Sequence, residues 1–140
     1  MASSWSNETS HNTESNENKL LEIEILNSLK EFIGSEPFGQ YLSEYINNTL
    51  SNIDRLGHAI ASEDEERVKQ FAHKLKGSAG NIGAMKLSTV CTEMQAMAHE
   101  ENINAALHGQ FEQIQKIYQE TKSALSDYIN ELEQSELKVG

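Results

Sequence analysis

The sequence contains very little cysteine or proline, and it has no long apolar run. Its 140 residues include a single proline and a single cysteine, Cys91. One cysteine cannot form an internal disulfide. No segment approaches the roughly 18 consecutive apolar residues of a membrane-spanning helix. The first ten residues, MASSWSNETS, lack the basic and apolar regions of a secretory signal. We therefore expect a cytoplasmic protein that has no contact with a membrane.

Aromatic and glycine residues are also few, at 6% aromatics and eight glycines, and hydrophobic residues make up only 37% of the chain. A β-sandwich or β-barrel needs many turns and many runs of β-branched residues. This composition therefore favours an all-α fold. The length is that of one domain of ordinary size, so a single core is expected.

The charge is strongly negative overall but unevenly distributed. Eleven Lys and Arg stand against 22 Asp and Glu, for a formal net charge of −11. Such a chain repels a phosphate backbone, which makes nucleic acid a poor partner. Residues 67–86 are the exception, because they carry five basic residues and no acidic one: Arg67, Lys69, Lys74, Lys76 and Lys86. A plain alternative is that these cations only complement the C-terminal end of a helix that starts with acidic residues.

Residues 1–18 differ in composition from everything that follows. Fourteen of them are Ser, Asn, Thr or Glu, without apolar periodicity. Such a segment buries too little apolar surface to offset its ordering entropy, so we expect a disordered polar tail. The tail is compatible with a stand-alone protein and equally with vector residues in front of an excised domain. We expect a helical bundle over 19–135 and a flexible end at 136–140.

Apolar periodicity predicts five helices within the bundle region. Their expected ranges are 19–33, 38–61, 63–81, 84–100 and 104–134. Ser62 and Glu65 have the spacing of a capping box at the start of the third helix. Four amphipathic helices with short links are buried most simply as an antiparallel up-down-up-down four-helix bundle. The additional N-terminal helix is expected to pack across one end or one side of it.

The third helix combines a buried stripe with a second, polar ridge. Val68, Ala72, Leu75, Ala79 and Ile82 have the spacing of a buried face. His73 lies about 100° round from this stripe, in register with four other residues: Lys69, Lys76, Gly77 and Gly80.

Glycine at position 77 is the notable member of this ridge. A helix side chain leans toward the N-terminus, so residue i+4 covers the surface around residue i, and Gly77 removes that cover from His73. A glycine inside a helix costs about 1 kcal/mol relative to alanine. Because this cost brings no gain in stability, we expect that another molecule must approach the ridge closely at Gly77.

The residues around His73 suit a phosphoryl acceptor. Positive charge from Lys74 and Lys76 favours the neutral, nucleophilic imidazole and attracts a phosphoryl group placed on it. If the third and fourth helices are antiparallel, the midpoint of His73 and Gln95 falls at the Gly83–Ala84 turn. Gln95 is then expected to hydrogen-bond one ring nitrogen and to leave the other free.

The run AHKLKGSAGNIGA, followed by Leu87, Cys91 and Gln95, resembles the histidine-containing phosphotransfer (HPt) domains of multistep two-component phosphorelays. Their signature is H-x-x-K-G with a further glycine six residues on, which His73, Lys76, Gly77 and Gly83 match. The recognisable stretch covers about residues 63–100.

This resemblance implies that His73 accepts a phosphoryl group from a receiver-domain aspartate and returns it to another. It implies a docking surface centred on Gly77, to which we assign Lys69, Lys74 and Gly80 as well. Lys76, with Lys74, would offset phosphoryl charge, and Gln95 would orient the ring. The implied partners are receiver domains of response regulators or of a hybrid histidine kinase. The chain is expected to be a monomer without a cofactor of its own, with Mg²⁺ on the receiver only.

Other constellations carry less chemistry. Cys91, His58 and His99 lack the i, i+4 spacing of a helical metal site, so we expect no metal, a core cysteine and solvated histidines, including His108. Met85, Met94 and Met97 are expected to fill the core. No ATP-binding loop or catalytic base is visible, so no kinase activity is expected. Two alternatives remain open: a helical interaction module with an incidental His73, and a small histidine kinase-like enzyme.

Overall fold

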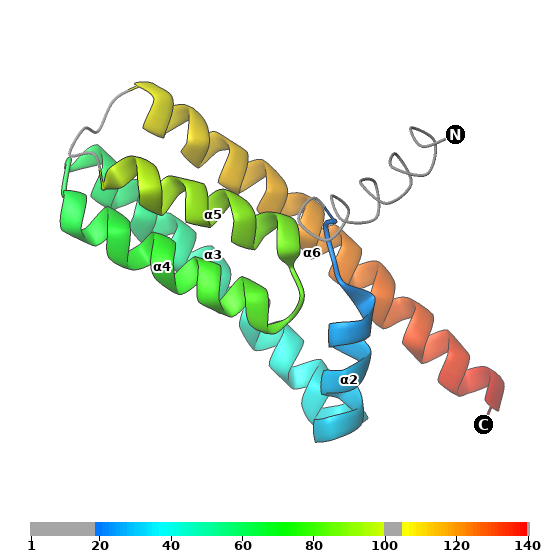
Figure 1. The fold of residues 1–140 in the computed structure, drawn as a ribbon. Helices are drawn as coiled ribbons and strands as arrows, with labels where there is room; N and C mark the ends of the chain where they lie inside the picture. The colour runs from blue at the N-terminus through cyan, green and yellow to red at the C-terminus, as the bar shows by residue number, and fades with distance from the viewer. Residues whose placement is uncertain (1–18, 100–104, 140) are drawn as a thin grey trace, which may run out of the picture.

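A computed structural model describes residues 19–99 and 105–139 of the chain, and this part is helical, without a strand (Figure 1). The predicted tail at 1–18 lies outside the described residues. The helices are α2 (Ile23–Ile33), α3 (Ser35–Ala61), α4 (Glu65–Asn81), α5 (Met85–Ala98) and α6 (Ala105–Val139). The all-α prediction is confirmed.

Helices α3 to α6 form the expected antiparallel four-helix bundle (Figure 1). Short turns join α3 to α4 and α4 to α5, and the predicted stripes face the common core. On α4, the buried residues are Val68, Ala72, Leu75 and Ala79. On α5, the buried residues are Leu87, Cys91, Met94 and Ala98. Burial raises the pKa of the Cys91 thiol to about 12.

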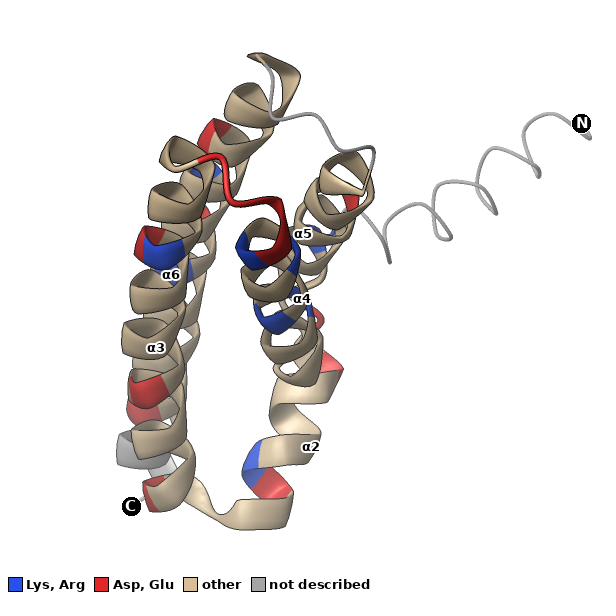
Figure 2. Cartoon of the chain, turned by 90° about the vertical axis from the view of Figure 1, so that its left-hand side faces the viewer, with Lys and Arg blue, Asp and Glu red and all other residues tan. Residues whose placement is uncertain are grey.

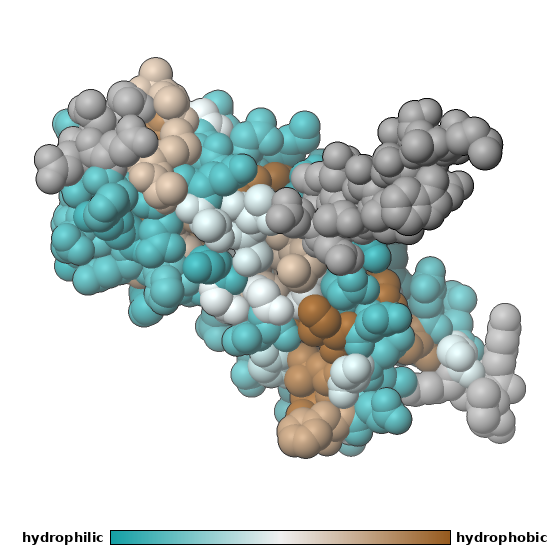
Figure 3. Space-filling view, in the orientation of Figure 1, coloured by the Kyte–Doolittle hydropathy of each residue, from teal (hydrophilic) through white to brown (hydrophobic). Residues whose placement is uncertain are grey.

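Helix α2 packs across one end of the bundle. This is one of the two arrangements that the sequence analysis expected, the other being packing along one side. The α4–α5 hairpin is short, with helices of 17 and 14 residues, whereas α3 and α6 have 27 and 35. Beyond the hairpin, α2 contacts the projecting ends of α3 and α6 (Figure 1). The Tyr128 hydroxyl donates to Asn27 Oδ1 at 2.5 Å, and the rings of Phe38 and Tyr128 meet edge to face at 6.1 Å. Figure 3 shows apolar surface over α2, where Phe32 is 88% exposed.

Several helix boundaries differ from the predicted ones. The first helix begins at Ile23 rather than Lys19, because residues 19–22 pair with the α4–α5 turn instead. The amide of Lys86 donates to the carbonyl of Lys19 at 3.0 Å, and the amide of Glu22 donates to the carbonyl of Gly83 at 2.7 Å. Helix α3 starts three residues early, and α6 continues five residues past its expected end, through Val139.

The predicted capping box at Ser62 is wrong. Helix α3 runs through Ala61, so Ser62 follows its end, and its Oγ donates to the carbonyl of His58 at 2.7 Å. Glu63 then reverses the chain with a φ of +54°. The N-cap of α4 is therefore Asp64, two residues later, whose Oδ1 accepts from the Arg67 amide at 3.2 Å.

Gly83 is fixed by the fold. Its φ is +79°, and a Cβ there would lie 2.8 Å from the carbonyl oxygen of Glu22. We expect Gly83→Ala to lower the free energy of unfolding by about 2 kcal/mol, from backbone strain and from the displaced Glu22 segment. Urea denaturation measures this. The matched control is Gly77→Ala, which should raise stability by up to about 1 kcal/mol, because its Cβ would meet no atom within 4 Å. Equal effects of the two substitutions would refute a structural role for Gly83.

Candidate functional site

His73 occupies the middle of α4, where it is the ninth of 17 residues. Its side chain is exposed, as is Gly77 one turn further on. Lys69, Lys76 and Gly80 are half-buried beside them. The structure therefore places the predicted ridge along one side of α4, with its two central members open to solvent.

Lys74 and Lys76 lie on opposite sides of His73. Lys76 is on the side of α5, since the Ser88 Oγ donates to the carbonyl of Lys76 at 3.2 Å. Lys74 is on the side of α3, where its Nζ lies 5.8 Å from the centre of the Phe71 ring and lines a hollow shared with α3 residues. By helix geometry, the two lysines leave α4 on either side of His73.

The cations of the basic segment are not equally available. Arg67 pairs with Asp64 at 3.6 Å, and Lys69 pairs with Glu65 at 3.1 Å. Within residues 19–99 and 105–139, no ion pair involves Lys74 or Lys76. Figure 2 shows acidic residues at the α3–α4 turn and basic residues further along α4. Unpaired positive charge is therefore concentrated near His73, rather than at the start of the helix.

Gly77 has no role in packing that would explain a glycine. A Cβ built at this position meets no atom within 4 Å. The φ of Gly77 is negative, so an L-residue fits the backbone as well. Because glycine lowers helix stability by about 1 kcal/mol, the free chain is expected to be more stable without it. An approaching molecule therefore remains the best physical reason for Gly77.

Gln95 makes no hydrogen bond to His73 in the described part of the structure. It is half-buried on α5, which runs antiparallel to α4 as the prediction requires. The orienting role of Gln95 remains a prediction about the complex rather than a feature of the free chain.

The predictions for the other histidines and for Cys91 hold, but of the three methionines predicted to fill the core only Met94 is buried, while Met85 and Met97 are half-buried. His58, His99 and His108 are exposed, and Cys91 is a buried free thiol. In the described ranges, no cluster of three His, Cys, Asp or Glu side chains is able to hold a metal ion. None of the described helices is long and apolar enough to cross a membrane.

The sequence analysis missed a groove between α3 and α4. One hollow of about 540 Å³ is lined by residues of both helices, among them Arg55, Arg67 and Phe71. A second hollow of about 460 Å³ adjoins it, shares Arg55 and is also lined by Lys74. Arg55 and Phe71 have no informative spacing in the sequence. Only the packing of α3 against α4 brings them together, so no signal in the sequence was available to find this groove.

Comparisons with known proteins identify similar sequences and a similar fold. The family model described as the Hpt domain matches residues 40–135. The sensor protein TorS of Escherichia coli (strain K12) is 28% identical over 92 residues, which cover 61% of this chain. The chain spans about 10% of the length of that relative. The crystal structure of histidine-containing phosphotransfer protein B from Pseudomonas aeruginosa PAO1 has a similar fold, with a TM-score of 0.75 at 19% identity, covering 81% of this chain and 96% of the other.

Proposed function

This chain belongs to the Hpt domain family, and from that premise we propose that it is a phosphorelay intermediate whose His73 carries the phosphoryl group. The observation that carries the proposal is the exposed His73 in mid-helix, followed one turn later by a glycine that packing does not require. Lys74 and Lys76, which have no acidic partner among the described residues, flank it.

The reaction is a reversible in-line transfer. A neutral imidazole nitrogen of His73 attacks the phosphorus of a receiver's aspartyl phosphate, so that an N–P bond forms while the acyl P–O bond breaks. The aspartate leaves as a carboxylate with the bonding electron pair, and the other ring nitrogen keeps its proton. Lys76 and Lys74 offset charge on the equatorial oxygens from the α5 and α3 sides. Transfer to a second receiver runs the same steps in reverse.

The proposed partners are receiver domains, belonging to response regulators or to a sensor kinase of the hybrid kind. A relative described as a sensor protein supports the second source. The proposed docking surface is centred on Gly77 and includes Lys69, Lys74 and Gly80, with Gln95 orienting the imidazole once the complex forms. We further propose that the chain acts as a monomer and has no ATP-dependent activity of its own, and that Mg²⁺ is held by the receiver.

Incubation with a panel of phosphorylated receivers tests this proposal. The expected result is transfer of label to the chain from at least one receiver, and no label from ATP alone. Binding to receivers without any transfer would favour a helical interaction module, in which His73 is incidental. Labelling by ATP alone would favour a histidine kinase-like enzyme. Either of these results contradicts the proposal.

Lys76→Ala is expected to slow the chemical step about tenfold or more, because the positive charge on the α5 side of the transferred group is lost. The half-saturating receiver concentration should change less. Rapid-quench kinetics at saturating phosphorylated receiver measures the step within the complex. Lys122→Ala, at an exposed position on α6, removes a comparable charge far from His73 and should have no effect. A normal rate within the complex for Lys76→Ala would show that this lysine does not act on the phosphoryl group.

A further inference from the structure

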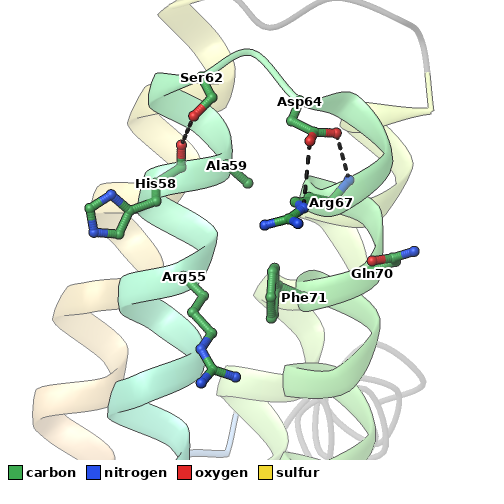
Figure 4. Close-up of a pocket in the computed structure, with 8 residues that line it drawn as sticks. All are labelled: Arg55, His58, Ala59, Ser62, Asp64, Arg67, Gln70 and Phe71. Atoms are coloured by element: carbon green, nitrogen blue, oxygen red, sulfur yellow. Dashed lines mark hydrogen bonds and ion pairs between the residues drawn. The ribbon is translucent and has the colours of Figure 1, made fainter.

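The groove between α3 and α4 contains two arginines, Arg55 and Arg67, that the transfer chemistry does not use. We call Arg55, Arg67, Phe71 and Lys74 together the α3–α4 groove. Figure 4 shows the Arg55 and Arg67 side chains extending from opposite helices into the space between them, with the Phe71 ring in between. The imidazole of His58 turns away from this space. Two basic groups and an aromatic ring thus face the same hollow.

The charges of the groove are only partly balanced. In the part of the chain that the structure describes, Arg55 makes no ion pair. Arg67 contacts Asp64 through Nε at 3.6 Å, and its side chain is 68% exposed. The Nζ of Lys74 lies over the Phe71 ring, 5.8 Å from its centre. The acidic residues in the lining are Asp64, already engaged, and Glu44 in the second hollow. The groove is therefore a cationic strip on a protein of net charge −11.

The shape of the groove favours a polypeptide over a small molecule. Small-molecule sites enclose most of their ligand, whereas this groove consists of two adjoining hollows along the surface between two helices, with an exposed arginine at one edge. Guanidinium groups recognise carboxylates by paired hydrogen bonds, and Phe71 offers an apolar contact beside them. An acidic segment with an apolar side chain has the matching chemistry.

The groove also adjoins the phosphoacceptor. Lys74 follows His73 directly on α4 and lies about 100° round the helix from it, on the side of the groove, so a partner seated on the imidazole reaches the near edge of the groove. We propose that the α3–α4 groove binds an acidic segment of the receiver that lies outside its phosphorylation pocket, and that Arg55 selects among receivers through this contact. This inference rests on the proposed function. It adds a recognition element on α3, the helix that does not carry the acceptor.

The test measures the rate of transfer to His73 as a function of receiver concentration, for the receiver that transfers fastest. Arg55→Glu should raise the half-saturating concentration about tenfold and leave the rate at saturation unchanged, because the contact forms in docking rather than in chemistry. The effect should shrink as ionic strength rises. Lys122→Glu is the matched control, with the same charge change at an exposed position on α6, and should shift the concentration less than twofold.

Charge exchange then identifies the partner residue. Acidic residues of the receiver outside its phosphorylation pocket are changed singly to arginine, and one of them should restore tight docking to Arg55→Glu while weakening docking to the native chain. Equal effects of Arg55→Glu and Lys122→Glu, or the absence of any restoring exchange, would overturn the groove proposal while transfer from the native receiver continued. Loss of transfer from every receiver to the native chain would instead contradict the proposed function.

Discussion

Replacing His73 with glutamine is expected to abolish labelling by every phosphorylated receiver, while the helical fold is retained. Glutamine has a similar volume but no nucleophilic ring nitrogen, so no N–P bond can form. Because the side chain is exposed, the free energy of unfolding should change by about 0.5 kcal/mol or less. The measurement is label transfer, together with circular dichroism and urea denaturation of the same preparation.

The bond that carries the label provides an independent check. Phosphate on an imidazole nitrogen is released by acid and survives alkali, so the label on the native chain should behave in this way. His58→Gln is the matched control, since His58 is another exposed histidine on a neighbouring helix, and it should be labelled normally. Label retained on His73→Gln at the native rate would mean that another residue is the acceptor.

Gly77→Gln should produce opposite changes in two measured quantities. The free energy of unfolding should rise by up to about 1 kcal/mol, because glutamine favours the helix and the position is open. Transfer from a phosphorylated receiver should fall by about 100-fold, because the new side chain leans over His73 and keeps the aspartyl phosphate from in-line contact. Denaturation curves and rapid-quench kinetics measure the two effects on one protein.

Gly109→Gln is the matched control for this experiment. Gly109 is also an exposed helical glycine whose Cβ would meet nothing within 4 Å, but it lies on α6. Its substitution should give the same gain in stability without slowing transfer. If Gly77→Gln transfers at the native rate, close approach of a partner does not explain this glycine, and its presence needs another cause.

The sequence predicted helices and their buried faces well, because periodicity reports directly on burial. Leu75 and Ala79 are buried as their spacing indicated. Boundaries were harder, because they depend on contacts with other elements. Glu22 lies outside α2 since its amide bonds the carbonyl of Gly83, 61 positions away. Likewise, Ser62 is not the N-cap of α4, because its hydroxyl donates to the carbonyl of His58 at the end of the preceding helix.

The candidate site divides in the same way. His73, Lys76 and Gly77 share one helix, so their relative positions follow from helix geometry and were predictable. Gln95 and Arg55 belong to other helices, and their positions relative to His73 depend on how the helices pack. The sequence analysis placed Gln95 at the height of the imidazole without being able to establish contact, and it had no reason to single out Arg55. The relative positions of residues on different helices therefore could not be predicted from the sequence, because they depend on interhelical packing.

The position of His73 within α4 has a thermodynamic consequence. Eight residues precede it and eight follow it in the helix, so it lies about 12 Å from either end. Stabilisation of an anion by a helix N-terminus fades within the first turn, so under the proposed function phosphate on His73 would gain nothing from it. What remains is the charge of flexible lysine side chains, which water and salt screen. Under the proposed function, the stabilisation of phosphate on His73 therefore weakens as ionic strength rises, and the helix dipole does not compensate for the loss.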